Sequence, residues 1–412
     1  MKRIAALLLI FAALLTGCGK KEASVPTTAA TVPPTTAAPT TEPTTEPTTE
    51  PAPVYFNPLN GEILEEPYDK RLYAVSINNL QEAMPHIGVQ DADIFVETYV
   101  NHSIIRGIAI FTDPSQVPAI GAVRSTRYIF NQLCKRYDMV MAHAGGSPMV
   151  LDDARTQGID NFNIDTGSET SYSFRHQERA KRMSWDACLF ARGDGLEAHA
   201  AENGYRTDGD PEKDYLLRFR EDGTPVDGET ADRIHMTLTF KSGMGVSRKD
   251  TDMIYDPGLG KYIYHQYGKD MVDGTTGEPE CFQNVLMLLA DIEMNQYGYQ
   301  VADFEAGGEG YYACGGKIIP ITWGCDSDTT PLNFKTQDGE TLEMGMGNTY
   351  IALMQNGSPV TYEEAAPPET EPPTEAPTEA PAEAPAEAPA EPAETVSSQG
   401  GDAAASPDED YL

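Results

Sequence analysis

Residues 120–128 read Ile120-Gly121-Ala122-Val123-Arg124-Ser125-Thr126-Arg127-Tyr128, and the predicted fold is organised around this stretch. An apolar run, Gly107 to Phe111, leads towards it, and a second run, Asp138 to Ala142, follows it. The second run ends in residues 143–148, His-Ala-Gly-Gly-Ser-Pro. The order is therefore strand, glycine turn, twin arginine, helix, strand, glycine turn. Because backbone N–H groups at such turns converge with side chains, the pattern predicts a binding site without defining its ligand.

The composition separates a central region from two low-complexity ends. Residues 18–53 form a Thr/Pro/Glu linker with a repeated Thr-Thr-Glu-Pro unit, and residues 363–412 form an acidic tail that repeats Glu-Ala-Pro. Neither segment can bury enough apolar surface to order itself, so both are predicted to be disordered. The remaining residues, 54–362, carry 46 acidic and 25 basic side chains, a formal charge of −21. This charge argues against nucleic-acid binding and against docking on anionic lipid through a basic patch.

The first 18 residues have the pattern of an export signal. Lys2 and Arg3 precede an apolar run of 12 residues, Ile4 to Leu15, which is too short for a usual membrane span. The run ends in Leu-Thr-Gly-Cys, which resembles a bacterial lipobox. We therefore predict that residues 1–17 are a signal peptide and that Cys18 carries the lipid that anchors the protein at the outer face of the cytoplasmic membrane. The alternative is an ordinary secretory signal followed by a chance cysteine.

The region from 54 to 205 predicts a mixed-sheet α/β subdomain. Its apolar, β-branched runs indicate strands, and the apolar spacing in Thr126–Tyr137 indicates a helix. Ser147 is expected to cap a second helix, which has Pro148 in its first turn. A short charged helix is expected over Ser173–Arg182, with three arginines on one face. The predicted strands are Tyr73–Ile77, Asp91–Val100, Ile104–Phe111 and Asp138–Ala142.

The region from 228 to 362 predicts a mostly antiparallel β subdomain. Met236, Leu238 and Phe240 alternate with polar residues, as in a half-buried strand. Further strand-like runs follow, and the polar, glycine-rich segment before residue 230 marks the boundary between the subdomains. The fold class is therefore α+β. The further runs are 253–255 with 262–264, 285–290, 307–312 with 317–323, and 345–353.

Several short motifs resemble one family along almost the whole of residues 54–362. They are Tyr-Ala-Val-Ser-Ile-Asn-Asn (73–79), Ala-Asp-Ile-Phe-Val-Glu (92–97), Gly-Ala-Val-Arg-Ser-Thr-Arg (121–127), His-Ala-Gly-Gly-Ser-Pro (143–148), Asn-Val-Leu (284–286) and Thr-Trp (322–323). In combination the chain resembles the YerB-like lipoproteins, which have two domains of unknown function (DUF3048). The resemblance implies a lipid-anchored envelope protein and no established activity.

The chain departs from this family pattern at two places. Asn101-His102 stands where the resemblance implies an acidic Glu-Gly, and residues 185–187, Trp-Asp-Ala, stand where it implies Pro-His-Asn. A histidine of that second motif, if it were catalytic in the family, has no counterpart here.

The candidate site rests on arginines gathered in one half of a very acidic domain. Arginine grips phosphate or carboxylate through a planar, bidentate fork. The glycine turn and Ser147 are expected to form a nest of N–H donors, to which His143 adds a donor that strengthens when protonated. The alternative is that the arginines form structural ion pairs with Glu97, Asp93, Asp152 and Asp153. The predicted ligand-binding residues are Asn78, Glu97, Arg106, Arg124, Arg127, His143, Gly145, Gly146, Ser147 and Arg175.

No catalytic, metal or cofactor motif is expected. Gly-Gly-Ser-Pro is not the Gly-x-Ser-x-Gly of an esterase elbow, and the seven histidines are scattered without metal-ligand spacing. Five cysteines follow Cys18. Of these, Cys134 is expected to be buried on a helix face, and Cys314 and Cys325 flank a probable hairpin and are candidates for a disulfide.

Two functions from different classes fit these features. The first is a non-catalytic lipoprotein that binds an anionic envelope ligand or a partner protein in the cleft of arginines and glycines. The second is an envelope enzyme that acts on a phosphate-linked glycopolymer or its lipid carrier, because the arginine strand and turn faintly resemble the LytR-CpsA-Psr transferases. We favour the first function, since no carboxylate pair near Arg124 would hold the metal that such chemistry usually needs.

Overall fold

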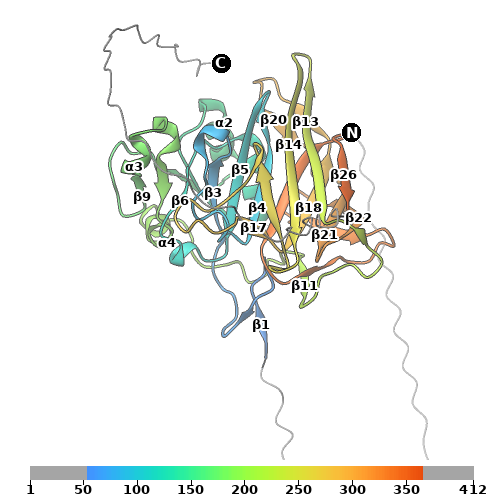
Figure 1. Ribbon diagram of the computed structural model, residues 1–412. Helices are drawn as coiled ribbons and strands as arrows, with labels where there is room; N and C mark the ends of the chain where they lie inside the picture. Colours follow the sequence, from blue (N-terminus) through green and yellow to red (C-terminus); the bar gives the residue numbers. More distant parts are fainter. Residues whose placement is uncertain (1–52, 365–412) are drawn as a thin grey trace, which may run out of the picture. The chain divides into compact units, whose positions relative to one another are not determined.

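A mixed sheet of eleven strands forms the centre of the structure, a computed structural model that describes residues 53–364 (Figure 1). Cys18, the predicted signal peptide and nearly all of the predicted linker and tail lie outside the described residues. Within residues 53–364, no helix is long and apolar enough to cross a membrane. The strands of the central sheet, in spatial order, are β12 (Glu229–Thr230), β22 (Lys317–Gly324), β21 (Gly308–Cys314), β18 (Asn284–Ala290), β25 (Thr349–Gln355), β4 (Ile94–Asn101), β5 (Ile104–Phe111), β3 (Tyr73–Asn78), β7 (Val140–His143) and β8 (Asn161–Asn163), with β23 (Asn333–Thr336) beside β22.

The central sheet joins strands from both predicted domains. Strand β25 lies between β18 and β4 and is parallel to both. On one side of it the pairing is mixed, because β5 runs antiparallel to β4 and β3 whereas β7 and β8 run parallel to β3. On the other side β18, β21 and β22 are antiparallel. The predicted α+β class is confirmed, while the division into domains at 54–205 and 228–362 stays a prediction.

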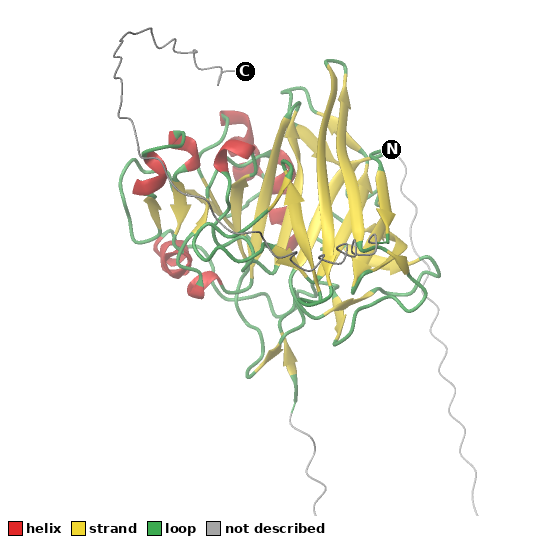
Figure 2. Cartoon of the chain, viewed as in Figure 1, coloured by secondary structure: helices red, strands yellow, loops and turns green. Residues whose placement is uncertain are grey.

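The helices of the described chain occur only in its amino-terminal part, beside the end of the central sheet that contains β3, β7 and β8 (Figure 2). Helix α1 (Tyr128–Tyr137) ends at Asp138, whose backbone is left-handed, with a φ of 55°. Helix α2 (Pro148–Thr156) begins after Ser147, whose Oγ accepts a hydrogen bond from the N–H of Val150. The four strands predicted in the amino-terminal region, the helix predicted over Thr126–Tyr137 and the Ser147 cap are therefore confirmed to within a few residues. The other helices are α3 (Gln177–Ala180) and α4 (Gly193–Glu202), with 3-10 turns η1 (Gln81–Ala83), η2 (Pro114–Gln116) and η3 (Trp185–Ala187).

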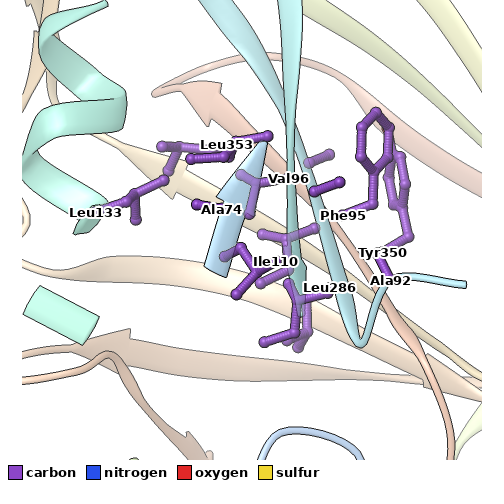
Figure 3. Close-up of a cluster of buried hydrophobic side chains, with 14 of the residues drawn as sticks. Ala74, Ala92, Phe95, Val96, Ile110, Leu133, Leu286, Tyr350 and Leu353 are labelled. Carbon is purple, nitrogen blue, oxygen red and sulfur yellow. The ribbon is translucent and has the colours of Figure 1, made fainter. Parts of the chain in front are cut away.

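One face of the central sheet packs against a second, six-stranded sheet. Neighbouring residues of a strand point to opposite faces, so Val96 faces α1 whereas Phe95 faces the second sheet. Figure 3 shows Leu133 of α1 and Phe95 at opposite ends of the buried cluster. Phe95 contacts the rings of Tyr264, Phe282 and Tyr350. The second sheet contains, in order, β16 (Lys269–Asp270), β15 (Lys261–Gln266), β14 (Gly245–Asp256), β13 (Arg233–Ser242) and β26 (Val360–Glu363), with β17 (Cys281–Phe282) beside β15.

The helix predicted over Ser173–Arg182 is largely wrong. Residues Ser173–Arg175 form strand β9, which pairs with β10 (Leu189–Ala191), and only Gln177–Ala180 is helical. Pairing with a strand that follows in sequence overrode the local helical spacing. Strand β6 (Ile120–Gly121) completes this three-stranded sheet, and three small pairs complete the fold: β1 (Tyr55–Phe56) with β2 (Ile63–Leu64), β11 (Arg218–Arg220) with β24 (Glu343–Gly345), and β19 (Ile292–Met294) with β20 (Gln300–Ala302).

The cysteines of the described region are all reduced. Cys134 is 1 % exposed on α1, as expected from the apolar spacing. The suggested pair of Cys314 and Cys325 does not form. Cys314 lies beside the turn of the β21–β22 hairpin, whereas Cys325 follows the far end of β22. Eight residues of strand separate the two ends by roughly 20 Å, too far for a disulfide.

Candidate functional site

The predicted site residues meet where several strands of the central sheet end. Parallel strands β3 and β7 finish at the same edge, and β5, which is antiparallel to β3, begins there. Asn78 and Arg106 are direct neighbours across β3 and β5, and His143 ends β7. The carboxyl ends of parallel strands are a frequent place for binding sites in open sheets. We call the group Asn78, Arg106, Arg124, Arg127, His143 and Gly145 the arginine edge.

The loop that carries Arg124 is held across this edge by backbone hydrogen bonds. The N–H of Asn78 donates to the carbonyl of Ala122, and the N–H of Arg124 donates to the carbonyl of Ser76, both at 2.8 Å. On its other side, the carbonyl of Arg124 accepts from the N–H of Ala144 at 3.0 Å. Residues 122–126 therefore lie between the end of β3 and the glycine turn after β7, which brings the two sequence motifs into one place.

Of the three arginines of this edge, Arg124 is the one whose guanidinium faces outward. Its Nη2 lies 2.8 Å from Oδ2 of Asp186, with 22 % of the arginine side chain and 45 % of the aspartate side chain exposed. Asp186 belongs to η3, one of the two places where the chain departs from the resembled family. An exposed pair of this kind contributes only a fraction of a kcal/mol to about 1 kcal/mol. The carboxylate of Asp186 therefore binds Arg124 only weakly.

Arg106 and Arg127 point inward and support the loop. Arg106 is 3 % exposed, and its Nη1 donates to the carbonyl of Ser125 at 2.6 Å. Arg127 is 9 % exposed, its Nη1 donates to the carbonyl of Thr126 at 2.8 Å, and its guanidinium lies 5.7 Å from the ring centre of Tyr299. Both side chains therefore fix the backbone around Arg124.

The glycine turn is shaped for close approach to the arginine loop. Gly145 has a φ of 73°, which favours glycine, and its N–H donates to the side chain of Asn163 at 3.0 Å. A Cβ on Gly146 would lie 3.2 Å from Cγ2 of Thr126, so a larger residue would press on the loop. Ser147 caps α2. At least one N–H group of the turn, that of Gly145, thus donates to Asn163 and is not presented to a ligand.

His143 is a neutral group at the floor of the arginine edge. It is 1 % exposed, and Nε2 lies 2.9 Å from Oδ1 of Asn161. The amide of Asn161 donates to the carbonyl of Ile159, so its Oδ1 accepts from His143 and the histidine proton sits on Nε2. Nδ1 is buried without a hydrogen-bond partner, and burial lowers the pKa of His143 below its ordinary value. A charged, protonated His143 is therefore disfavoured at neutral pH.

Glu97 and Arg175 do not join the arginine edge. Glu97 lies beside Gly107 on β5, one residue out of step with the row of Thr98, Arg106 and Asn78, so its side chain points to the opposite face of the sheet. Arg175 lies on β9, where it pairs with Asp165 at 2.8 Å and stacks 3.8 Å from the ring centre of Trp185.

The structural alternative paired the arginines with Glu97 and Asp93, but both carboxylates have other partners in the structure. Asp93 accepts hydrogen bonds from Thr112, Asn57 and Asn60, and the carboxylate of Glu97 pairs with Lys249. Arg179, one of the three arginines on the face of the predicted helix, is 4 % exposed and donates to the carbonyls of Ala83 and Pro85.

A second polar group, not recognised in the sequence, lies on the other face of the central sheet. Lys249 of β14 is 9 % exposed, and its Nζ donates to Glu97 and to Oγ1 of Thr251. Glu97 also accepts hydrogen bonds from Tyr350 and, at 2.7 Å, from Asn79. We call these residues, with Tyr264 and Gln266, the buried polar cluster. A signal existed in the spacing, since Lys249 and Thr251 precede Met253 at alternate positions and so share the inner face of β14.

Two family models match the chain, one in each half of the described region. The family described as "Protein of unknown function (DUF3048) N-terminal domain" matches residues 59–206, and its C-terminal domain matches residues 242–351. The chain belongs to this family, a class of two-part α+β proteins without an assigned activity, and the resemblance drawn from the motifs is confirmed.

One relative, compared both by its sequence and by its crystal structure, places the chain more closely. The chain is 25 % identical over 305 residues to the protein named "Putative lipoprotein YerB" of Bacillus subtilis (strain 168), covering 72 % of this chain and 85 % of the relative. The crystal structure of the YerB protein from Bacillus subtilis matches with a TM-score of 0.61 and 23 % identity, over 74 % of this chain and 99 % of that one. This second match shows the shared fold.

Proposed function

We propose that this protein is a lipid-anchored envelope protein that binds an anionic ligand, or an anionic group on a partner protein, at the arginine edge. The anchor is Cys18, and the predicted linker holds the folded region away from the outer face of the cytoplasmic membrane. The name of the relative, a lipoprotein, supports the anchoring. The binding proposal rests on the geometry around Arg124.

The observation that carries the proposal is the outward guanidinium of Arg124 on a rigidly held loop. Arg106 and Arg127 donate to the loop carbonyls, so the loop need not reorganise when a ligand arrives. A preorganised site loses less conformational entropy on binding. Asp186 already presents a carboxylate to Arg124 at 2.8 Å, which indicates that an anion fits there.

The chemistry of this edge favours an anion over a neutral ligand. Arg124 and Arg127 belong to one loop, and Arg106 of β5 donates to the carbonyl of Ser125 in that loop. Neutral His143 adds no negative charge that would repel an anion. Hydrogen bonds from a guanidinium to an anion contribute about 1.5–3 kcal/mol each. Asp186 is then a competitor that an incoming phosphate or carboxylate displaces.

Two substitutions test this site from opposite directions. Arg124→Lys keeps the charge and loses the planar fork, so it should weaken binding of inorganic pyrophosphate measured by calorimetry. Asp186→Asn removes the competing carboxylate, so it should strengthen binding about two- to fivefold, the equivalent of an exposed ion pair. Arg155→Lys, in an exposed pair with Asp152 on α2, is the matched control and should bind as the parent does.

A purely structural role of Arg124 predicts different results. If Arg124 serves only to hold η3 in place, both substitutions should lower the melting temperature, and pyrophosphate should bind neither the parent nor Asp186→Asn. That result would reject the arginine edge as an anion site.

A further inference from the structure

A cleft of about 630 Å³ opens around the free edge of β14 beside the β4–β5 hairpin, and residues from both faces of the second sheet line it. It lies away from the arginine edge. It forms because β14 is longer than its neighbour. Strand β14 pairs with β13 from Gly245 to Ile254, whereas β15 pairs with β14 only from Thr251 onward. The space beside residues 248–250 is therefore not filled by a strand. We call it the hairpin cleft.

The wall of this cleft includes two members of the buried polar cluster, Lys249 and Gln266. The ammonium of Lys249 has three donors, and the structure gives two of them partners, Glu97 and Thr251. Gln266 is 1 % exposed, and its Nε2 donates to Asn79 at 3.0 Å. Its Oε1, however, is buried without a hydrogen-bond partner.

An unpartnered buried acceptor in a cleft wall is costly unless something binds it. Buried polar groups are almost always hydrogen-bonded, and leaving one unsatisfied costs about 1–3 kcal/mol. Lys249, which lines the same cleft, has one donor without a hydrogen-bond partner among those that the structure gives it. The group that satisfies both at once is a hydroxyl, because it accepts one hydrogen bond and donates another.

The charges around the cleft do not select an anion. Asp250 and Asp252 balance Arg233 and Arg248 along its wall, and Glu97 compensates Lys249. Carboxylates and guanidiniums together offer both acceptors and donors to several hydroxyls.

Tyr267, which is half-buried, adds flat apolar surface to this polar wall, whereas Tyr99 is 5 % exposed. Tyr99 and Tyr267 both line the cleft, and the hydroxyl of Tyr267 donates to the carbonyl of Asn79 at 2.8 Å, which holds that ring in place. Polar groups of both kinds beside aromatic rings suit an uncharged ligand with many hydroxyls.

We propose that the hairpin cleft binds a neutral saccharide, one hydroxyl of which accepts from Lys249 and donates to Oε1 of Gln266. The site is separate from the arginine edge and independent of its function. An exported protein held at a cell surface meets glycans there, which makes a saccharide the fitting member of the polyol class.

The test is a glycan array probed with the full mature chain, followed by calorimetry with the best neutral oligosaccharide. The array should include neutral, amino and phosphorylated glycans. We expect binding to neutral members, and Gln266→Leu should weaken it at least tenfold because the buried acceptor is lost. Gln300→Leu is the matched control: Gln300 is also fully buried with an unpartnered amide, but it lies on β20, outside the cleft wall.

Each outcome decides the proposal. A silent array, binding to phosphorylated glycans alone, or Gln266→Leu binding as tightly as the parent would overturn it, the last because a water then satisfies Gln266. Binding that is lost in Arg124→Lys and kept in Gln266→Leu would assign the glycan to the arginine edge instead. Should Gln266→Leu not fold, the exposed Arg248→Ala decides: weaker binding of the same glycan supports the cleft, and unchanged binding rejects it.

Discussion

Replacing Lys249 by methionine should destabilise the protein more than any exposed lysine substitution. The Lys249 side chain is 7 % exposed, and its partner Glu97 is fully buried. Methionine fills a similar volume but carries no charge, so the carboxylate of Glu97 would keep only the hydrogen bonds from Asn79, Tyr350 and Thr251. The substitution therefore isolates the cost of one buried, uncompensated charge.

The expected cost follows from measurements on comparable buried pairs. Removing one partner of a buried salt bridge costs about 3–5 kcal/mol, because the other charge stays out of water. A loss of 1 kcal/mol lowers the melting temperature of a large domain by about 2–4 °C. The melting temperature of Lys249→Met should therefore fall by roughly 6–20 °C.

A double-mutant cycle measures the interaction between Lys249 and Glu97. Glu97→Gln removes the charge from the other side, so Lys249→Met combined with Glu97→Gln should be less destabilised than the two single changes added together. Chemical unfolding followed by circular dichroism measures all four proteins. Lys269→Met, at an exposed lysine of β16, is the matched control and should change stability by less than about 0.5 kcal/mol.

Two results would refute the reasoning. One is a cost of Lys249→Met below about 1 kcal/mol, and the other is a double variant as destabilised as the two single changes added together.

The remaining predictions concern His143 and Cys18. Burial lowers the pKa of His143 below 6.5, so the unfolded chain binds a proton below this pH that the folded chain resists, and the parent should lose stability as pH falls from 7.5 to 5.5. His143→Gln should lose less over the same range in thermal melts, and an equal loss would show that His143 does not cause it. Cys18→Ala should leave the protein in the soluble fraction or as an unprocessed precursor after cell fractionation, and a lipid-modified Cys18→Ala protein would disprove the anchor.

Strands and caps were predictable from sequence where the local signal and the tertiary structure agree. The β-branched run of Ile104–Phe111 is strand β5 from its first to its last residue, and Ser147 before Pro148 starts α2 as expected. The helix prediction for Ser173–Arg175 was wrong because these residues pair with Leu189–Ala191, which lies outside the stretch with helical spacing. Non-local pairing of this kind leaves no trace in local spacing.

The site was predictable in part for the same reason. Turns at strand ends located Arg124 and His143, since a strand end and the turn after it are neighbours in sequence. Glu97 was placed with the arginines because the sequence does not reveal which face of a fully buried strand a residue occupies. Lys249 was missed because its burial depends on Glu97, a partner 152 positions away.

Strand β25 has a consequence for how the chain becomes a folded protein. It lies between β4 and β18 and supplies the hydrogen-bonding partner of residues 94–97 from residues 349–352. A chain that leaves a ribosome or an export channel amino end first must therefore keep the edge of β4 unpaired until almost all of its folded residues have emerged. An unpaired apolar edge is a place where strands of other chains can add. The time between the arrival of residue 101 and that of residue 355 is thus the period in which this protein most needs protection by a chaperone.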